Sequence, residues 1–142
     1  MVEGGRVPLR PGVAGLIGRA ALSGVRIAIA TTTSRANVEA LVRAAWGRPA
    51  GEVFEVIAAG DEVDAKKPAP DVYLLALERL AMRPGAAIAL EDSRNGLASA
   101  KAAGLRVAVT PSVYTAGEDF SDADWLLPSL LPNGLPRDLR FA

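Results

Sequence analysis

The chain contains no histidine and no cysteine among its 142 residues. These two absences exclude disulfide bonds, zinc sites built from thiolate and imidazole, a Ser-His-Asp triad and a cysteine nucleophile. Aromatic residues are also few, with 2 Trp, 2 Tyr and 3 Phe. Any chemistry must therefore come from carboxylates, hydroxyls, lysine, arginine, backbone amides or a hard metal ion.

An excess of charge and long apolar runs are missing as well. Lys plus Arg and Asp plus Glu number 16 each, so the formal net charge is zero. The sequence lacks the basic patch that is typical of proteins that bind nucleic acid or anionic membranes. No apolar run approaches the roughly 18 residues that span a bilayer, and residues 1–12 lack the apolar stretch of a signal peptide. We predict a cytoplasmic protein with neither nucleic acid nor membrane as a partner.

Short apolar runs alternate with segments of helical period, which predicts one α/β domain with a parallel sheet and helices on both faces. The expected strands are residues 26–31, 53–58, 86–90, 106–110 and 125–127. The expected helices are residues 12–22, a helix from Arg35 that buries Val38, Leu41, Val42 and Ala45, a helix that buries Tyr73, Leu74, Leu77, Leu80 and Ala81, and residues 94–103. Residues 128–142 contain three prolines and predict an irregular strap over the surface.

Polar motifs follow three of the expected strands, at the edge where parallel sheets bind ligands. The run Thr31-Thr32-Thr33-Ser34 opens a helix, and hydroxyls with free backbone N–H groups favour an anion such as phosphate. Lys67 directly precedes Pro68, which stiffens the backbone and holds the ammonium group on a rigid turn. The acids Glu91 and Asp92 supply only oxygen ligands, which suit Mg²⁺.

Each motif alone also has an ordinary structural explanation. Hydroxyl residues cap helices, so Ser34 or Ser93 needs no ligand to explain it, and Asp92 is a further candidate cap. A Lys-Lys pair is usually a solvated surface feature, and we interpret the acids of residues 61–64 as solvated too. The three motifs in the order hydroxyl, lysine and acid pair are far more specific than any one of them.

Three segments carry a resemblance to a known superfamily, namely RIAIATTTSRANVEAL, KKPAPDVYLLALERL and IALEDSRNGLASAKAAG. Over about residues 10–127 the chain resembles the haloacid dehalogenase-like (HAD) hydrolases, in particular the branch of CbbY, phosphoglycolate phosphatase and β-phosphoglucomutase. The resemblance implies a Rossmann-like sheet and a small phosphorylated sugar or metabolite as the ligand. It also implies that the Thr31 hydroxyl and the Thr32 amide bind the transferring phosphoryl group, and that Lys67 neutralises its charge. Glu91 and Asp92 would belong to a Mg²⁺ site, and Thr31, Lys67 and Asp92 are the expected catalytic residues.

The sequence departs from the superfamily pattern at its defining motif. The nucleophile of these enzymes is an Asp in a D-x-D-G-T motif after a central apolar strand, and no such motif is present. The only D-x-D, Asp122-Ala123-Asp124, leads into a strand and is expected at the opposite edge of the sheet. The resemblance therefore implies that the central strand and the cap domain are missing, and that residues 1–11 are the linker returning from the cap. Two interior strand edges would face each other, which creates a hazard of self-association through them unless another segment fills the gap or the two strands pair directly.

Two hypotheses of function follow. In the first, the chain is a truncated portion of a Mg²⁺-dependent phosphatase, inactive on its own, that supplies the phosphate-binding and metal-binding half of the site. In the second, it is a non-catalytic module that binds phosphorylated ligands or a partner chain. A fragment of a β-phosphoglucomutase-like phosphotransferase is a further alternative, and a Rossmann dehydrogenase is disfavoured because no G-x-G-x-x-G follows a strand.

Overall fold

The computed structural model describes residues 12–141 of the chain. The helices are α1 (Val13–Leu22), α2 (Arg35–Trp46), α3 (Ala50–Val53), α4 (Asp71–Leu80) and α5 (Arg94–Ala102). The strands are β1 (Ala28–Ala30), β2 (Val56–Ala58), β3 (Ile88–Glu91), β4 (Arg106–Val109) and β5 (Trp125–Leu126). This order confirms the predicted α/β class. The linker predicted for residues 1–11 lies outside the described residues.

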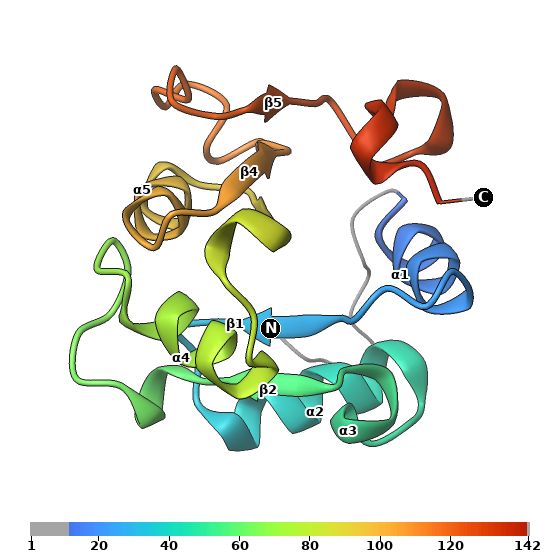
Figure 1. Cartoon of the computed structure of the whole chain (residues 1–142), viewed down its shortest axis with the longest axis vertical. Coiled ribbons are helices and arrows are strands. Elements are labelled where there is room, and N and C mark those ends of the chain that lie inside the picture. Colours follow the sequence, from blue (N-terminus) through green and yellow to red (C-terminus); the bar gives the residue numbers. More distant parts are fainter. Residues whose placement is uncertain (1–11, 142) are drawn as a thin grey trace.

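All strand pairs are parallel, but they form two separate sheets (Figure 1). The first has the order β1-β2, with Ile29 opposite Ile57, and the second has the order β3-β4-β5, with Ala89 opposite Val107. Within residues 12–141, no strand pairs with the second edge of β1 or with the second edge of β3. The second edges of β1 and β3 are thus unpaired among the described residues, which agrees with the expectation of two open strand edges.

Helices cover both faces of the sheets, and alternate strand residues point into different cores. On one face, α4 and α5 pack against a core that reaches across both sheets and includes Val56, Ala58, Ala89, Val107 and Val109. On the other face, Ile57 joins α2 and α3 in a second core, and Ala108 joins α1 in a third. The C-terminal residues are irregular apart from short 3-10 helices at Pro132–Gly134 and Arg137–Leu139, and they bury Leu130, Leu135 and Leu139 in the third core.

Some strand ends differ from the sequence prediction, because the first residues of the apolar runs form a helix or an ion pair instead of strand pairs. Val53 was predicted to begin a strand, which is wrong, since it ends the short helix α3. That helix is held at its start, where the Ala50 N–H donates to Glu39 Oε2 over 3.1 Å. Strand β1 starts at Ala28 instead of Arg26, whose guanidinium pairs with Glu55 at the edge of the sheet.

The helices follow the predicted periodicity except on the buried face of α4. Ser34 caps α2 by accepting the Asn37 N–H over 3.2 Å, and Gly47 ends that helix with a left-handed φ of 68°. In α4 the prediction was wrong at two positions, because Leu74 is 48% exposed and Ala81 is an exposed residue beyond the helix end, while Val72 lies in the core. None of the helices that the structure describes is long and apolar enough to cross a membrane.

Candidate phosphate site

The turn after β1 holds the predicted hydroxyl run in a defined shape. The Thr31 N–H donates to the Ala58 carbonyl over 3.0 Å, which continues the pairing with β2 beyond the strand. The Thr31 hydroxyl oxygen accepts the Thr33 N–H over 3.2 Å, and the Thr33 carbonyl accepts the Gly60 N–H over 2.7 Å. Ser34 then caps α2, so helix capping explains this residue without a ligand. Thr31 and Thr32 precede the cap, in the turn between β1 and α2.

A second segment supports this turn at Thr32. A Cβ atom on Gly60 would lie 1.9 Å from the Thr32 carbonyl oxygen, so only glycine lets the two backbones approach this closely. The same oxygen accepts a hydrogen bond from Lys66 Nζ over 3.2 Å. The Lys-Lys pair is therefore not a purely solvated feature, because Lys66 ties the loop after β2 to the turn after β1.

Lys67 lies between the ends of the two sheets. Its Nζ atom is 3.2 Å from the Ala30 carbonyl oxygen at the end of β1 and 2.5 Å from Glu91 Oε2 at the end of β3. The side chains are 12% exposed for Lys67 and 8% exposed for Glu91, so this is a largely buried ion pair. The structure brings together two of the residues that the sequence singled out from different strands.

The Glu91 carboxylate has two further neighbours that the sequence analysis did not predict. The Tyr73 hydroxyl donates to Glu91 Oε2, and the Tyr73 ring centroid lies 4.9 Å from Lys67 Nζ. Burial raises the pKa of the Tyr73 hydroxyl well above its usual range, and the nearby Glu91 charge raises this pKa further. On the other side, a Cβ atom on Gly96 would lie 1.8 Å from Glu91 Oε1. The Glu91 carboxylate therefore fills a space that exists only because residue 96 is glycine.

Asp92 lies at the bend after β3 and is exposed to solvent. Its carbonyl accepts the Thr115 hydroxyl over 2.6 Å, and the Arg94 N–H next to it donates to Glu118 Oε1 over 2.7 Å. The loop that follows β4 thus fixes the backbone at Asp92. Ser93 is the cap of α5, accepting the Gly96 N–H over 3.1 Å, so capping does not account for the Asp92 side chain.

The two carboxylates at the end of β3 supply some, but not all, of the ligands that a magnesium ion needs. Asp92 offers an exposed carboxylate, and Glu91 offers Oε1, since Oε2 already contacts Lys67 and Tyr73. Among residues 12–141, no group of three or more His, Cys, Asp or Glu residues is arranged to hold a metal ion. Two carboxylates with waters and a substrate phosphate are nevertheless a usual Mg²⁺ environment.

The D-x-D sequence lies away from this edge. The Asp124 N–H donates to the Val107 carbonyl over 2.9 Å, and Asp124 Oδ2 accepts the Val107 N–H and Lys101 Nζ. Asp124 directly precedes β5, so it lies at the amino end of the parallel strands. This position agrees with the exclusion of Asp124 as the nucleophile.

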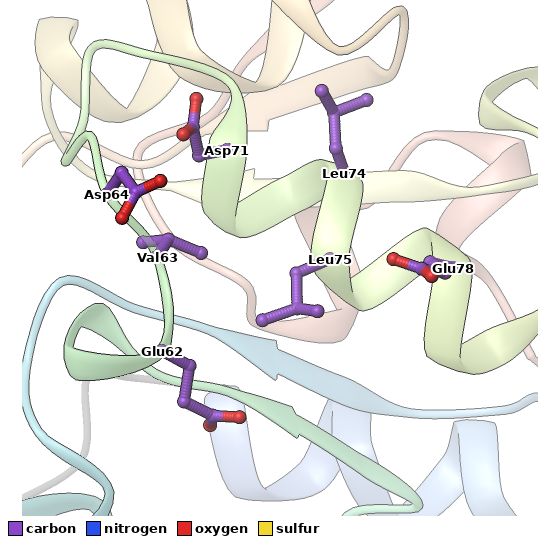
Figure 2. Close-up of a pocket in the computed structure, with 7 residues that line it drawn as sticks. All are labelled: Glu62, Val63, Asp64, Asp71, Leu74, Leu75 and Glu78. Atoms are coloured by element: carbon purple, nitrogen blue, oxygen red, sulfur yellow. The ribbon is translucent and has the colours of Figure 1, made fainter.

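An open pocket of about 400 Å³ lies between the loop after β2 and helix α4 (Figure 2). It is lined by Glu62, Val63, Asp64, Asp71, Leu74, Leu75 and Glu78. Four carboxylates and no cation line it, so a phosphate dianion would be repelled there.

The interpretation of Glu62 as a solvated acid was wrong, because Glu62 pairs with Arg79 and Arg35. The hydrogen bond from Arg79 also lowers the pKa of Glu62.

Comparison with known proteins identifies the family of the chain. Residues 2–104 match the family model described as haloacid dehalogenase-like hydrolase. The CbbY protein of Rhodobacter capsulatus is 65% identical over 130 residues, which are 92% of this chain and 57% of that protein.

Solved structures give the same result. The crystal structure of CbbY from Rhodobacter sphaeroides in complex with phosphate has a TM-score of 0.84 and 59% identity, over 86% of this chain and 54% of that chain. An aspartate-to-asparagine variant of that CbbY, in complex with xylulose 1,5-bisphosphate, matches equally well, with a TM-score of 0.84. The chain thus spans a little over half the length of these relatives. On the family match and the shared fold, this chain belongs to the haloacid dehalogenase-like hydrolases.

Proposed function

We propose that this chain supplies the phosphate-binding and metal-binding half of a Mg²⁺-dependent phosphatase that acts on a small sugar phosphate. The observation that carries the proposal is the place of Lys67 between β1 and β3, in contact with both the Ala30 carbonyl and Glu91. An ammonium group has three N–H donors. Within the described residues, Lys67 Nζ has hydrogen bonds to these two acceptors, which leaves one donor for a phosphoryl oxygen.

The turn after β1 supplies the remaining donors for the phosphoryl group. Thr31 follows β1 directly, and the turn that it begins ends at the first residues of α2. A hydroxyl, backbone amides and the positive end of a helix dipole all favour an anion there. In this proposal, the Thr31 hydroxyl and the Thr32 amide orient the phosphoryl oxygens, and Lys67 stabilises the charge that builds up on them during transfer.

The metal would be held by Asp92 and by Glu91 Oε1. A Mg²⁺ ion supplies charge neutralisation for the phosphoryl oxygens when it is bound. The contacts of Thr115 and Glu118 fix the backbone around Asp92. The substrate class is supported by the two CbbY structures, one with phosphate and one with xylulose 1,5-bisphosphate.

Binding of inorganic phosphate to the purified chain tests the proposal directly. We expect ³¹P NMR titrations with Mg²⁺ present to show saturable binding that Lys67→Met abolishes. Lys101→Met is the matched control, because Lys101 is a partly exposed lysine whose partner, Asp124, lies at the opposite edge of the strands. An unchanged affinity in the folded Lys67→Met variant, or an equal loss in both variants, would contradict the proposal.

Turnover separates the two functional hypotheses, which both predict an inactive chain, from a self-sufficient enzyme. The sequence holds no D-x-D-G-T motif, so we expect the chain alone to bind phosphate without hydrolysing an aryl phosphate such as p-nitrophenyl phosphate in the presence of Mg²⁺. This combination favours an incomplete phosphatase or a binding module over a self-sufficient enzyme. Hydrolysis that Lys67→Met abolishes would show that the chain has its own nucleophile and would refute the missing-nucleophile part of the proposal.

A further inference from the structure

The buried hydroxyl of Tyr73 is not explained by packing. Tyr73 lies in the first turn of α4, is 7% exposed and belongs to the core that spans both sheets. A phenylalanine would fill nearly the same volume without bringing a polar atom into that core. A buried hydroxyl costs free energy unless it forms a hydrogen bond, and the acceptor here is the Glu91 carboxylate.

Tyr73 contacts both members of the buried ion pair. Its hydroxyl and Lys67 Nζ share one acceptor atom, Glu91 Oε2, while its ring lies 4.9 Å from Lys67 Nζ. Ammonium groups are attracted to aromatic faces at such distances. The ammonium group therefore has a carbonyl, a carboxylate and an aromatic ring as neighbours, and these directions restrict where its remaining N–H points.

We propose that Tyr73 is a positioning residue for the phosphate site, which holds the Glu91 carboxylate through its hydroxyl and the Lys67 ammonium through its ring. The inference rests on the proposed function, since it concerns the same lysine. Without the hydroxyl, Glu91 Oε2 would keep Lys67 as its one hydrogen-bond partner, and the carboxylate would be held less firmly. The third donor of Lys67 would then have a less sharply fixed direction.

The composition of the chain makes the test simple. It has 3 lysines, Lys66, Lys67 and Lys101, and 2 tyrosines, Tyr73 and Tyr114. Competitive methylation with limiting ¹³C-formaldehyde and a borane reductant gives one NMR signal for each lysine, so each rate is measured in the same sample. Tyr73→Phe removes only the buried hydroxyl, and Tyr114→Phe is its matched control because Tyr114 is 93% exposed.

In the wild-type chain we expect Lys67 to react more slowly than the other two lysines. Tyr73→Phe should raise the Lys67 rate by about fivefold or more, as expected for a lost hydrogen bond to a charged group, while Tyr114→Phe leaves it unchanged. An unchanged Lys67 rate in Tyr73→Phe would overturn the inference. A similar rise at Lys66 and Lys101 would also overturn it, because it would show general loosening of the fold.

A second measurement distinguishes this inference from the proposed function. Inorganic phosphate should bind Tyr73→Phe about threefold or more weakly than Tyr114→Phe, because part of the charge-assisted hydrogen bonding at the site is lost. If the wild-type chain binds no phosphate, the proposed function fails, and the lysine rates still decide the role of Tyr73. If the wild-type chain does bind phosphate, equal phosphate affinities in the two variants would overturn the positioning role, whatever the lysine rates show.

Discussion

Replacing Gly96 with alanine should destabilise the protein although it improves a helix. Gly96 lies in the first turn of α5, where alanine ordinarily adds about 0.5–1 kcal/mol of stability over glycine. Here the added methyl group would lie 1.8 Å from Glu91 Oε1, whereas real Cβ atoms essentially never approach closer than 3.0 Å. The Glu91 carboxylate must therefore move by at least 1.2 Å.

The magnitude follows from what holds the carboxylate in place. Glu91 Oε2 is bonded to Lys67 Nζ at 2.5 Å and to the Tyr73 hydroxyl, and a displaced carboxylate cannot keep both contacts in their present geometry. Hydrogen bonds to charged groups contribute about 1.5–3 kcal/mol each, so losing one or weakening both outweighs the helix gain. We expect a net loss of about 0.5–2.5 kcal/mol in the free energy of unfolding.

Urea denaturation followed by far-UV circular dichroism measures this loss, with Gly18→Ala as the control. Gly18 is also in a helix, α1, but no atom of the described residues beyond its chain neighbours and the backbone of its own helix lies within 4 Å of the position of its added methyl group. Gly18→Ala should therefore stabilise the chain by about 0.5–1 kcal/mol while Gly96→Ala destabilises it. If both variants were stabilised equally, Glu91 would not be held against Gly96, and the account of the buried ion pair would be refuted.

Two further predictions concern the capping and the pH dependence of the fold. Ser34→Ala removes the acceptor of the Asn37 N–H and should cost about 1 kcal/mol in urea denaturation, and no loss would show that this cap does not stabilise α2. The pKa of Asp124 in the folded state is lowered mainly by the hydrogen bond from the Val107 N–H and, to a smaller extent, by the hydrogen bond from Lys101. The ionised Asp124 therefore stabilises the fold above its ordinary pKa of 3.8, and this stabilisation is lost as the pH falls through the lowered pKa of the folded state. Asp124→Asn should therefore weaken the acid dependence of unfolding, and an identical pH profile in the variant would contradict this assignment.

The sequence predicted the central residues of every strand and some of the strand ends, such as Ala58 and Arg106, but not the others. An apolar run such as residues 53–58 fits a buried strand and a short helix equally well over its first residues. The outcome at Val53 depends on Glu39, a residue from the previous helix that accepts the Ala50 N–H. Contacts of this kind, between residues distant in sequence, cannot be predicted from a local pattern of apolar residues.

The same limit applies to the candidate site. Because parallel strands end at one edge, Thr31, Lys67 and Glu91 were predicted to lie near one another. The direct ion pair between Lys67 and Glu91 was not predicted, because strand order alone does not fix side-chain contacts. Tyr73 was assigned to the core of α4, which is where it lies, but its hydroxyl was an unused signal, since a polar atom on a buried helical face needs a partner.

The open edges of β1 and β3 have a consequence for the dynamics of the fold. In most sheets the middle strands exchange their amide hydrogens most slowly, because both edges are paired. Within the described residues, β1 and β3 each have one paired edge and one unpaired edge, and every residue of β1 is half-buried. The amides in the centre of the molecule should therefore exchange faster than those of β4, so that protection from solvent is lowest where the two sheets meet. Phosphate bound at Lys67 would slow this exchange from one end of both strands.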